Sequence, residues 1–240
     1  MEKMEKNTKT EFYNLIILDR SGSMETIRTE AINGCNETLG TIKSAQRNNA
    51  HTQKHFVSLL EFCSCRLNYV FENVPVDDAR PIGENDYEPC CCTPLYDAMG
   101  NGLNSLFNLV KDKEDVAVSV TIITDGYENA STEYDACAIV ALIDRLKAKG
   151  WLFAYIGADH DVERVAAGIH IDNTLRFNKT KEGTRTMFLQ DRKSRIRWYT
   201  KMSDAHDERI NMTADEREAS DARMARDYFK KDKEEDKGEK

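Results

Sequence analysis

Apolar residues along the chain fall into two kinds of segment. Some segments are almost continuously apolar, as expected for strands covered on both faces: residues 12–19, 116–126 and 151–159. Others carry apolar side chains at intervals of three and four, which predicts helices: residues 25–46, 95–110 and 136–149. The two kinds alternate, which predicts an α/β fold with a Rossmann-like, doubly wound and mostly parallel sheet between helices.

Two further apolar segments predict one edge of this sheet. Residues 55–63 and 66–74 are separated by only two residues, so we expect an antiparallel hairpin there. A short helix near residues 162–167 and a strand at residues 174–177 follow later in the chain. The sheet is therefore predicted to be mixed, with a single antiparallel edge.

The chain divides into four predicted parts. Residues 1–10 are polar and predicted to be disordered, and the packed domain covers residues 11–178. Residues 179–202 are rich in Lys and Arg and predict a basic helical extension. Residues 203–240 predict a charged helix, opened by a capping box at Thr213, and then a disordered tail.

The basic extension has two interpretations. Its cations, with Trp198 and Tyr199 among them, are a combination that binds nucleic acid when aromatic rings stack on bases. The interpretation we favour is a helix that packs its apolar side chains against the domain. Those side chains are Met187, Phe188, Ile196, Trp198 and Met202.

The overall composition limits the function. The chain has 240 residues, and 40% of them are hydrophobic, which is enough for a core. Its 34 basic and 42 acidic residues give a net charge of −8, which argues against a whole-chain role in coating nucleic acid or anionic lipid. No apolar run reaches the roughly 18 residues of a membrane-spanning helix, and the N-terminus lacks the apolar segment of a secretory signal. We expect a cytoplasmic protein without a membrane partner.

The seven cysteines do not indicate a disulfide framework, because their number is odd and residues 90–92 are three cysteines in a row. Cys63 and Cys65 are one residue apart, and neither spacing matches a zinc ribbon. We therefore expect ordinary reduced thiols rather than a zinc or redox site. Cys35 and Cys137 occupy apolar helical positions and are expected in the core.

Polar residues with metal-binding chemistry follow two predicted strands. Asp19 and Asp125 each end a strand, and at the switch point of a doubly wound sheet such strand ends share one crevice. Ser21 and Ser23 follow in a short loop, and Thr93 lies just before a predicted helix able to reach the same crevice. Oxygen ligands suit Mg²⁺, Mn²⁺ or Ca²⁺ rather than zinc. The sequence therefore predicts a divalent-cation site.

Hydroxyl ligands leave the charge of such an ion incompletely neutralised, so the ion still attracts an anion. Gly22 is expected to permit the tight loop in which Ser21 and Ser23 face one ion. One coordination position is then available to a carboxylate from outside the chain.

Three segments together carry a family resemblance. "DRSGSM" at residues 19–24, the threonine of "CTPLYDAMG" at residues 92–100, and "TDGYENAS" at residues 124–131 resemble the three parts of the metal-ion-dependent adhesion site (MIDAS) of von Willebrand factor type A (VWA) domains. The later segments "GWLFAYIGAD" and "NTLRFN" resemble the intracellular bacterial and phage members. The resemblance covers about residues 11–200.

The resemblance implies a central sheet between helices with a divalent ion, usually Mg²⁺, at its top. It implies that Ser21, Ser23 and Thr93 contact the ion directly or nearly so, and that Asp19 and Asp125 act directly or through water. An Asp or Glu of a protein partner typically completes the coordination. We therefore expect a metal-dependent protein-binding module and not an enzyme.

A Mg²⁺-dependent hydrolase or phosphotransferase is the alternative, because a metal ion in a crevice can activate water or phosphate. The sequence offers little support for it. No second aspartate lies two residues after Asp19, and the chain contains no Walker-type phosphate loop and no evident pair of nucleophile and base. His160 is expected to be a loop residue.

Overall fold

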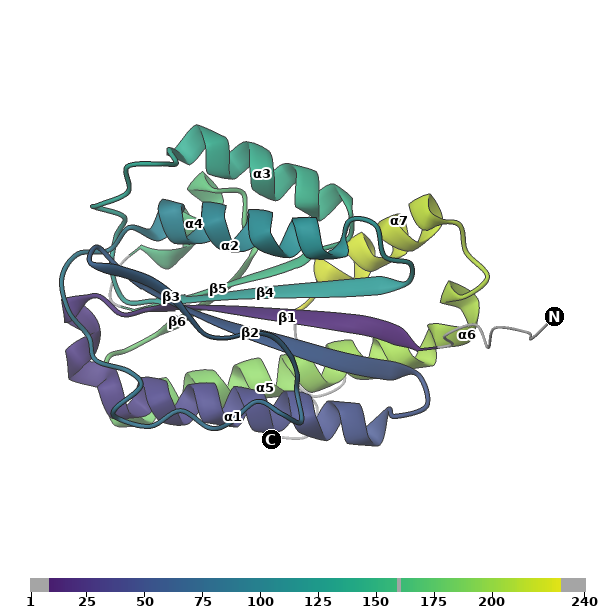
Figure 1. The fold of residues 1–240 in the computed structure, drawn as a ribbon, viewed down its shortest axis with the longest axis horizontal. Helices are drawn as coiled ribbons and strands as arrows, with labels where there is room; N and C mark the ends of the chain where they lie inside the picture. The colour runs from purple at the N-terminus through teal and green to yellow at the C-terminus, as the bar shows by residue number, and fades with distance from the viewer. Residues whose placement is uncertain (1–8, 159–160, 230–240) are drawn as a thin grey trace, which may run out of the picture.

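The parallel strands lie between two layers of helices in the computed structural model, which describes residues 9–158 and 161–229 (Figure 1). The strands are β1 (Thr10–Asp19), β2 (Gln53–Cys63), β3 (Arg66–Pro75), β4 (Val116–Thr124), β5 (Leu152–Ala158) and β6 (Asn173–Phe177). The helices are η1 (Gly22–Ile27), α1 (Arg28–Asn48), α2 (Leu95–Val110), α3 (Ala136–Ala148), α4 (Val162–Gly168), α5 (Lys181–Asp204), α6 (His206–Arg209) and α7 (Ala214–Ala225). The predicted α/β alternation is confirmed.

The strand order is β3-β2-β1-β4-β5-β6. All neighbouring pairs are parallel except β2 and β3, so the predicted antiparallel hairpin at one edge is confirmed. The chain leaves β1 toward β2 and later returns to β4 on the other side of β1. This reversal is the switch point of a doubly wound sheet, and it opens a crevice where β1 and β4 end.

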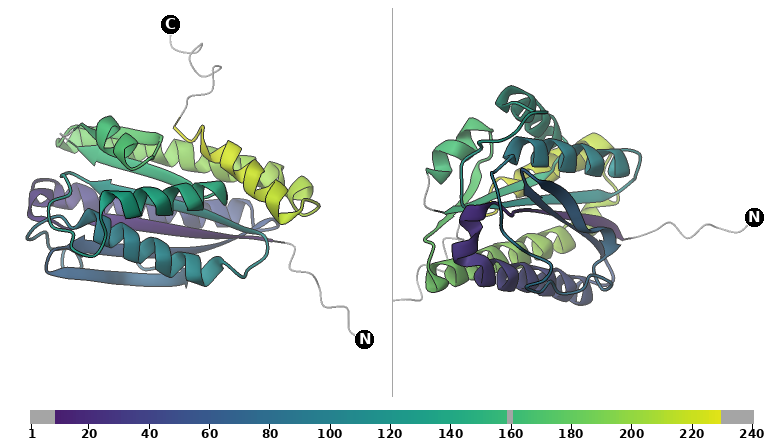
Figure 2. Two further views of the ribbon diagram at one scale, coloured as in Figure 1. Left: turned by 90° about the horizontal axis from the view of Figure 1, so that it is seen from above. Right: turned by 60° about the vertical axis from the view of Figure 1, so that its left-hand side comes forward.

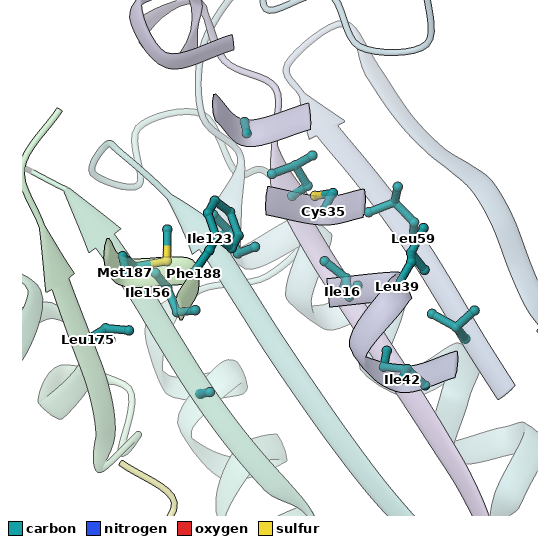
Figure 3. Packing of buried hydrophobic residues seen from close by; sticks show 14 of the residues in the cluster. Ile16, Cys35, Leu39, Ile42, Leu59, Ile123, Ile156, Leu175, Met187 and Phe188 are labelled. Carbon is teal, nitrogen blue, oxygen red and sulfur yellow. The ribbon is translucent and has the colours of Figure 1, made fainter. Parts of the chain in front are cut away.

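Successive residues of β1 contribute to two separate cores. Phe12, Ile16 and Leu18 pack on the side of α1 and α5, whereas Tyr13 and Ile17 pack on the side of α2 and α3. Figure 3 shows the first core, with Ile16 next to the α1 side chains of Cys35, Leu39 and Ile42. Since both faces of the strand are buried, its sequence is apolar at almost every position.

The predicted basic extension forms α5, which lies beside α1 and covers the same face of the sheet (Figure 1). Four of the five apolar side chains expected to pack there are buried: Met187, Phe188, Trp198 and Met202. The fifth expectation was wrong, because Ile196 is 42% exposed on the outer side of the helix. The favoured interpretation of a packed helix is otherwise confirmed.

Arg195 and the two neighbouring aromatic residues of α5 are buried in the interior, whereas the other basic residues of this helix are exposed or half-exposed. Arg195 is buried and pairs with Asp191 at 3.0 Å, and its Nη2 also donates to Thr121 Oγ1 at 2.9 Å. Trp198 and Tyr199 pack edge-on against Phe12 and are buried. Rings held in this way are not available to stack on bases, which removes the aromatic part of the nucleic-acid alternative.

The charged segment after α5 packs at the opposite end of the sheet from the crevice (Figure 2). The predicted capping box is confirmed, because Thr213 N–H donates to Glu216 Oε2 at 2.8 Å and Glu216 N–H donates to Thr213 Oγ1 at 3.3 Å. Arg209 is buried between Asp115 and Asp221. The N-terminal disorder expected for residues 1–10 is wrong at Thr10, which is buried and begins β1. The expectations for residues 1–8, for His160 and for the tail after residue 229 lie outside the described residues. None of the helices in the described ranges is long and apolar enough to cross a membrane.

Candidate metal centre

The carboxylate of Asp19 is fixed at the end of β1. It is fully buried, and its Oδ1 accepts a hydrogen bond from Ser21 N–H at 2.7 Å. Its Oδ2 accepts one from Thr124 Oγ1, the last residue of β4, at 2.6 Å. Burial raises the pKa of Asp19 to about 6; the two hydrogen bonds oppose this shift and the charge of Asp125 adds to it. The group is thus held at the switch point by both strands.

The loop between β1 and η1 brings two hydroxyls to the other carboxylate. Ser23 Oγ donates to Asp125 Oδ1 at 2.5 Å, and Ser21 Oγ lies 3.2 Å from Ser23 Oγ. The expected role of Gly22 is not supported. Its φ is not positive, and an added Cβ would lie 3.5 Å from Cys91 O, which is ordinary contact. The loop follows from hydrogen bonds such as Gly22 N–H to Cys91 O at 3.0 Å rather than from glycine's freedom.

Thr93 reaches the site from the loop before α2. Its N–H donates to Asn129 Oδ1 at 2.8 Å, and its carbonyl accepts from Asn129 N–H at 3.1 Å. A Cβ added at Gly126 would lie 3.5 Å from Thr93 Oγ1 and 3.7 Å from Ser23 Oγ, so these hydroxyls face the same point beside Asp125. The structure therefore brings the five predicted residues to one end of the sheet, as the right-hand view of Figure 2 shows for their loops.

Asp125 has one oxygen that the protein leaves poorly satisfied. Its Oδ2 is buried and accepts no hydrogen bond of good geometry, although Lys179 Nζ lies 3.0 Å away. A buried carboxylate oxygen needs a cation or donors to offset its lost hydration. Together with the oxygen chemistry of Ser21, Ser23 and Thr93, this atom fits a hard divalent cation.

Several supporting residues were missed from the sequence. Asp97, in the first turn of α2, accepts hydrogen bonds from the backbone N–H groups of Thr132, Glu133 and Tyr134. Glu128 accepts from the N–H of Tyr96 and from those of residues 130 and 131. These carboxylates hold the loop after Asp125 against α2. The acids inside "LYDA" and "GYEN" were the available signal.

The cysteine expectations were partly wrong. Cys35 is buried in the core as expected, but Cys137 is exposed. Cys63, Cys65 and Cys90 come together beside the metal-site loops, which their spacing along the chain did not predict. The chain brings them together only through the β2–β3 turn and the loop before Thr93.

Comparison with solved structures identifies the fold. A von Willebrand factor type A protein from Catenulispora acidiphila aligns with 78% of this chain at 15% identity and a TM-score of 0.53. The pilus adhesin SpaC from Lactobacillus rhamnosus GG aligns with 80% at 15% identity and a TM-score of 0.57. Proximal thread matrix protein 1 from the mussel byssus, solved with a zinc-occupied MIDAS motif, aligns with 79% at 14% identity and a TM-score of 0.50.

These similarities show a VWA-type fold. The alignments span 43%, 30% and 46% of the three solved chains, so this chain corresponds to less than half of each. No protein-family model matches the sequence. No curated protein matches it either.

Proposed function

We propose that this chain is a VWA-type binding module that uses a divalent cation to bind an acidic group of a protein partner. Asp19, Ser21, Ser23, Thr93 and Asp125 would hold the cation. Mg²⁺ is the expected ion, with Mn²⁺ and Ca²⁺ as alternatives. When bound, the ion would supply a positive charge and one coordination position that a carboxylate of the partner can fill. The expectation of a cytoplasmic location stays a prediction.

The observation that carries this proposal is the convergence of the Thr93 and Ser23 hydroxyls on the buried carboxylate of Asp125. Two carboxylates provide two negative charges, and the hydroxyls add none. A divalent ion bound there keeps its attraction for an outside anion when one of the carboxylates acts only through water. The solved structure of proximal thread matrix protein 1 with its zinc-occupied MIDAS motif supports metal binding by this fold.

An enzymatic function has less support. A hydrolase needs a positioned base or nucleophile beside the metal. In the part of the chain that the structure describes, the carboxylates of Asp19 and Asp125 contact the Ser21 backbone, Thr124, Ser23 and Lys179, and no His or Cys is among these partners. One of the similar structures is a pilus adhesin, which agrees with a binding role for the fold. Metal-dependent hydrolysis of a phosphate ester remains the second candidate.

The first test is metal binding, measured as thermal stabilisation. At a concentration of Mg²⁺ or Mn²⁺ 100 times the Kd, the native state gains about 2.7 kcal/mol, or about 5–10 °C in Tm for a chain of this size. Thr93→Ala and Ser23→Ala should each lose most of this shift. Ser44→Ala is the control and should keep the full shift in Tm. It removes a hydroxyl on α1 that donates to Gly40 O, at an exposed hydrogen bond away from the site.

The second test is metal-dependent partner binding. The wild-type chain should retain a protein from a lysate of the source organism in Mg²⁺ and release it in chelator, and Thr93→Ala should not retain it. Retention that is equal with and without metal contradicts the proposal. If Mg²⁺ shifts the Tm and no partner is retained, turnover of phosphate esters by the loaded protein would establish the enzymatic candidate instead.

A further inference from the structure

Three thiols form a compact cluster beside the predicted Mg²⁺ site. Cys63 is the last residue of β2, Cys65 lies in the β2–β3 turn, and Cys90 lies in the loop before α2. Their Sγ atoms are separated by 3.3 Å (Cys63 to Cys65), 3.4 Å (Cys63 to Cys90) and 3.4 Å (Cys65 to Cys90). The cluster is therefore nearly an equilateral triangle. Among the described residues it is the group of His, Cys, Asp and Glu side chains that fits a metal ion.

This triangle has nearly the dimensions of one face of a tetrahedral zinc site. A Zn–S bond of about 2.3 Å implies Sγ atoms about 3.8 Å apart in an ideal tetrahedron. The thiols would need to separate by only about 0.4 Å to accept an ion at that bond length. Deprotonation of thiols on metal binding removes their protons from the centre of the triangle.

The surroundings suit thiolates. Arg20 Nη1 lies 3.6 Å from Cys90 Sγ and 3.8 Å from Cys63 Sγ, and Arg20 is buried. A guanidinium in this position can donate weak hydrogen bonds to metal-bound sulfur and offset its negative charge. Cys91 also makes side-chain contacts with Cys65 and Cys90, so a fourth thiol lies beside the triangle, although it is outside the group of three whose Sγ atoms all lie within 4.8 Å of one another.

A single disulfide explains this geometry less well. A disulfide requires two sulfurs about 2.05 Å apart and leaves the third without a partner. The three separations here are almost equal, so no pair is favoured over the others. A zinc ion uses all three thiols at once, and zinc prefers thiolate to the oxygen ligands of the neighbouring site.

We propose that Cys63, Cys65 and Cys90 bind a zinc ion, with Cys91 as the fourth ligand. This site is separate from the proposed Mg²⁺ site, and its existence does not depend on that function. It would fasten the loop that carries Thr93 to the β2–β3 turn. One backbone bond already joins these two segments, because Ser64 N–H donates to Cys92 O at 3.0 Å, and a second ties the loop to the end of β1, because Cys90 N–H donates to Arg20 O at 2.8 Å.

The test is zinc content and cobalt spectroscopy on the full chain, purified under reducing conditions. We expect one equivalent of zinc after gel filtration, and a thiolate-to-metal charge-transfer band when Co²⁺ replaces it. Cys90→Ser should lose the band and the zinc. Cys92→Ser is the matched control, because Cys92 is exposed in the same loop and lies outside the triangle. It should keep both.

The cobalt experiment also distinguishes the proposed zinc site from the proposed Mg²⁺ site. Cobalt at the oxygen site produces no thiolate band, so Ser23→Ala should leave the band unchanged. Circular dichroism checks that Cys90→Ser is folded. The cobalt spectrum of the wild-type chain tests the proposal without relying on any variant. Absence of the band in wild type, an equal band in Cys90→Ser, or a disulfide among the three cysteines in the presence of zinc would each overturn the proposal.

Discussion

Lys179 Nζ lies 3.0 Å from Asp125 Oδ2, so a side chain from just before α5 places a positive charge at the proposed Mg²⁺ site. This ion pair occupies the carboxylate oxygen that accepts no hydrogen bond of good geometry among the described residues. A metal ion and the Lys179 ammonium would therefore compete for the same carboxylate. Lysine is a flexible point charge and can withdraw from the site when a stronger cation binds.

Replacing Lys179 by methionine should strengthen metal binding. The variant removes a positive charge beside the ion and keeps most of the aliphatic stem, and a partly exposed charge at this distance is worth about 1 kcal/mol, or roughly fivefold in Kd. Isothermal titration with Mn²⁺ measures this change. Lys181→Met, an exposed neighbour in the first turn of α5, is the control and should leave the Kd unchanged. Weaker binding in Lys179→Met would show that Lys179 supports the site instead.

The contact between α1 and α5 depends on the absence of a side chain at Gly34. A Cβ there would lie 1.8 Å from the Phe188 ring, which Figure 3 shows in the core between the helices and the sheet. Gly34→Ala should lower the free energy of unfolding by about 3 kcal/mol, because the ring and the helices must move apart. Gly40→Ala on the same helix meets no atom within 4 Å and should stabilise the protein by up to about 1 kcal/mol. Urea denaturation of both variants measures the contrast, and equal effects would contradict it.

Removing one partner of the ion pair between Arg195 and Asp191 should lower the stability more than replacing both partners by apolar side chains. Both side chains are buried, and Tyr228 OH also donates to Asp191 Oδ1 at 2.9 Å. Asp191→Ala leaves the Arg195 charge unpaired and should cost about 3–5 kcal/mol. Arg192, next to Asp191 on α5, makes a half-exposed pair with Glu37 of α1, and Arg192→Ala should cost less than about 1 kcal/mol.

Denaturant titration of the double variant Asp191→Leu with Arg195→Met completes this comparison. The double variant should lose less stability than Asp191→Ala, since no buried charge is left. If Asp191→Ala and Arg192→Ala cost the same, the buried pair is not an important part of the core.

His55 should make the native state less stable in acid. Burial, and secondarily the charge of Arg195, lowers the pKa of His55 to about 3, from about 6.5 in the unfolded chain. Below pH 6.5 the unfolded state binds a proton that the folded state excludes. The contribution of this residue to stability is therefore complete above pH 6.5 and is lost as the pH falls toward 3.

A variant that cannot titrate isolates this effect from the acidic groups that also titrate. Between pH 7 and pH 4.5, wild type should lose about 2 kcal/mol of stability relative to His55→Gln. His51→Gln, at an exposed position in the α1–β2 connection, is the control. The ring signals of His55 in an NMR pH titration provide a direct check: a neutral ring at pH 5 is expected, and a charged one contradicts the argument.

The sequence predicted the sheet well because buried parallel strands leave a strong pattern. Both faces of β1 are covered, so its residues are apolar almost without interruption, and Asp19 stands out at its end. The two residues between residues 63 and 66 were enough to predict the β2–β3 hairpin. The five candidate metal ligands were predicted in the same way, from polar residues placed at the ends of apolar strands and before a helix.

Contacts between distant segments leave much weaker signals in a sequence. The exposed position of Ile196 depends on the rotation of α5 about its axis, and a helix with many charged residues has only a weak apolar stripe. The Lys179–Asp125 pair joins the end of the sheet to the start of α5, and one of many lysines gives no local sign of such a role.

By itself the sequence determined the alternation of strands and helices and the chemistry available at the strand ends, because both are local properties of the chain. Only the tertiary structure decided which groups meet. Thr93 and Asp125 come together through the reversal of strand order at β1, and Cys63 and Cys90 come together through the β2–β3 turn and the loop before α2. Such contacts depend on the relative positions of packed elements, which are set by the filling of two cores and not by the spacing of residues along the chain.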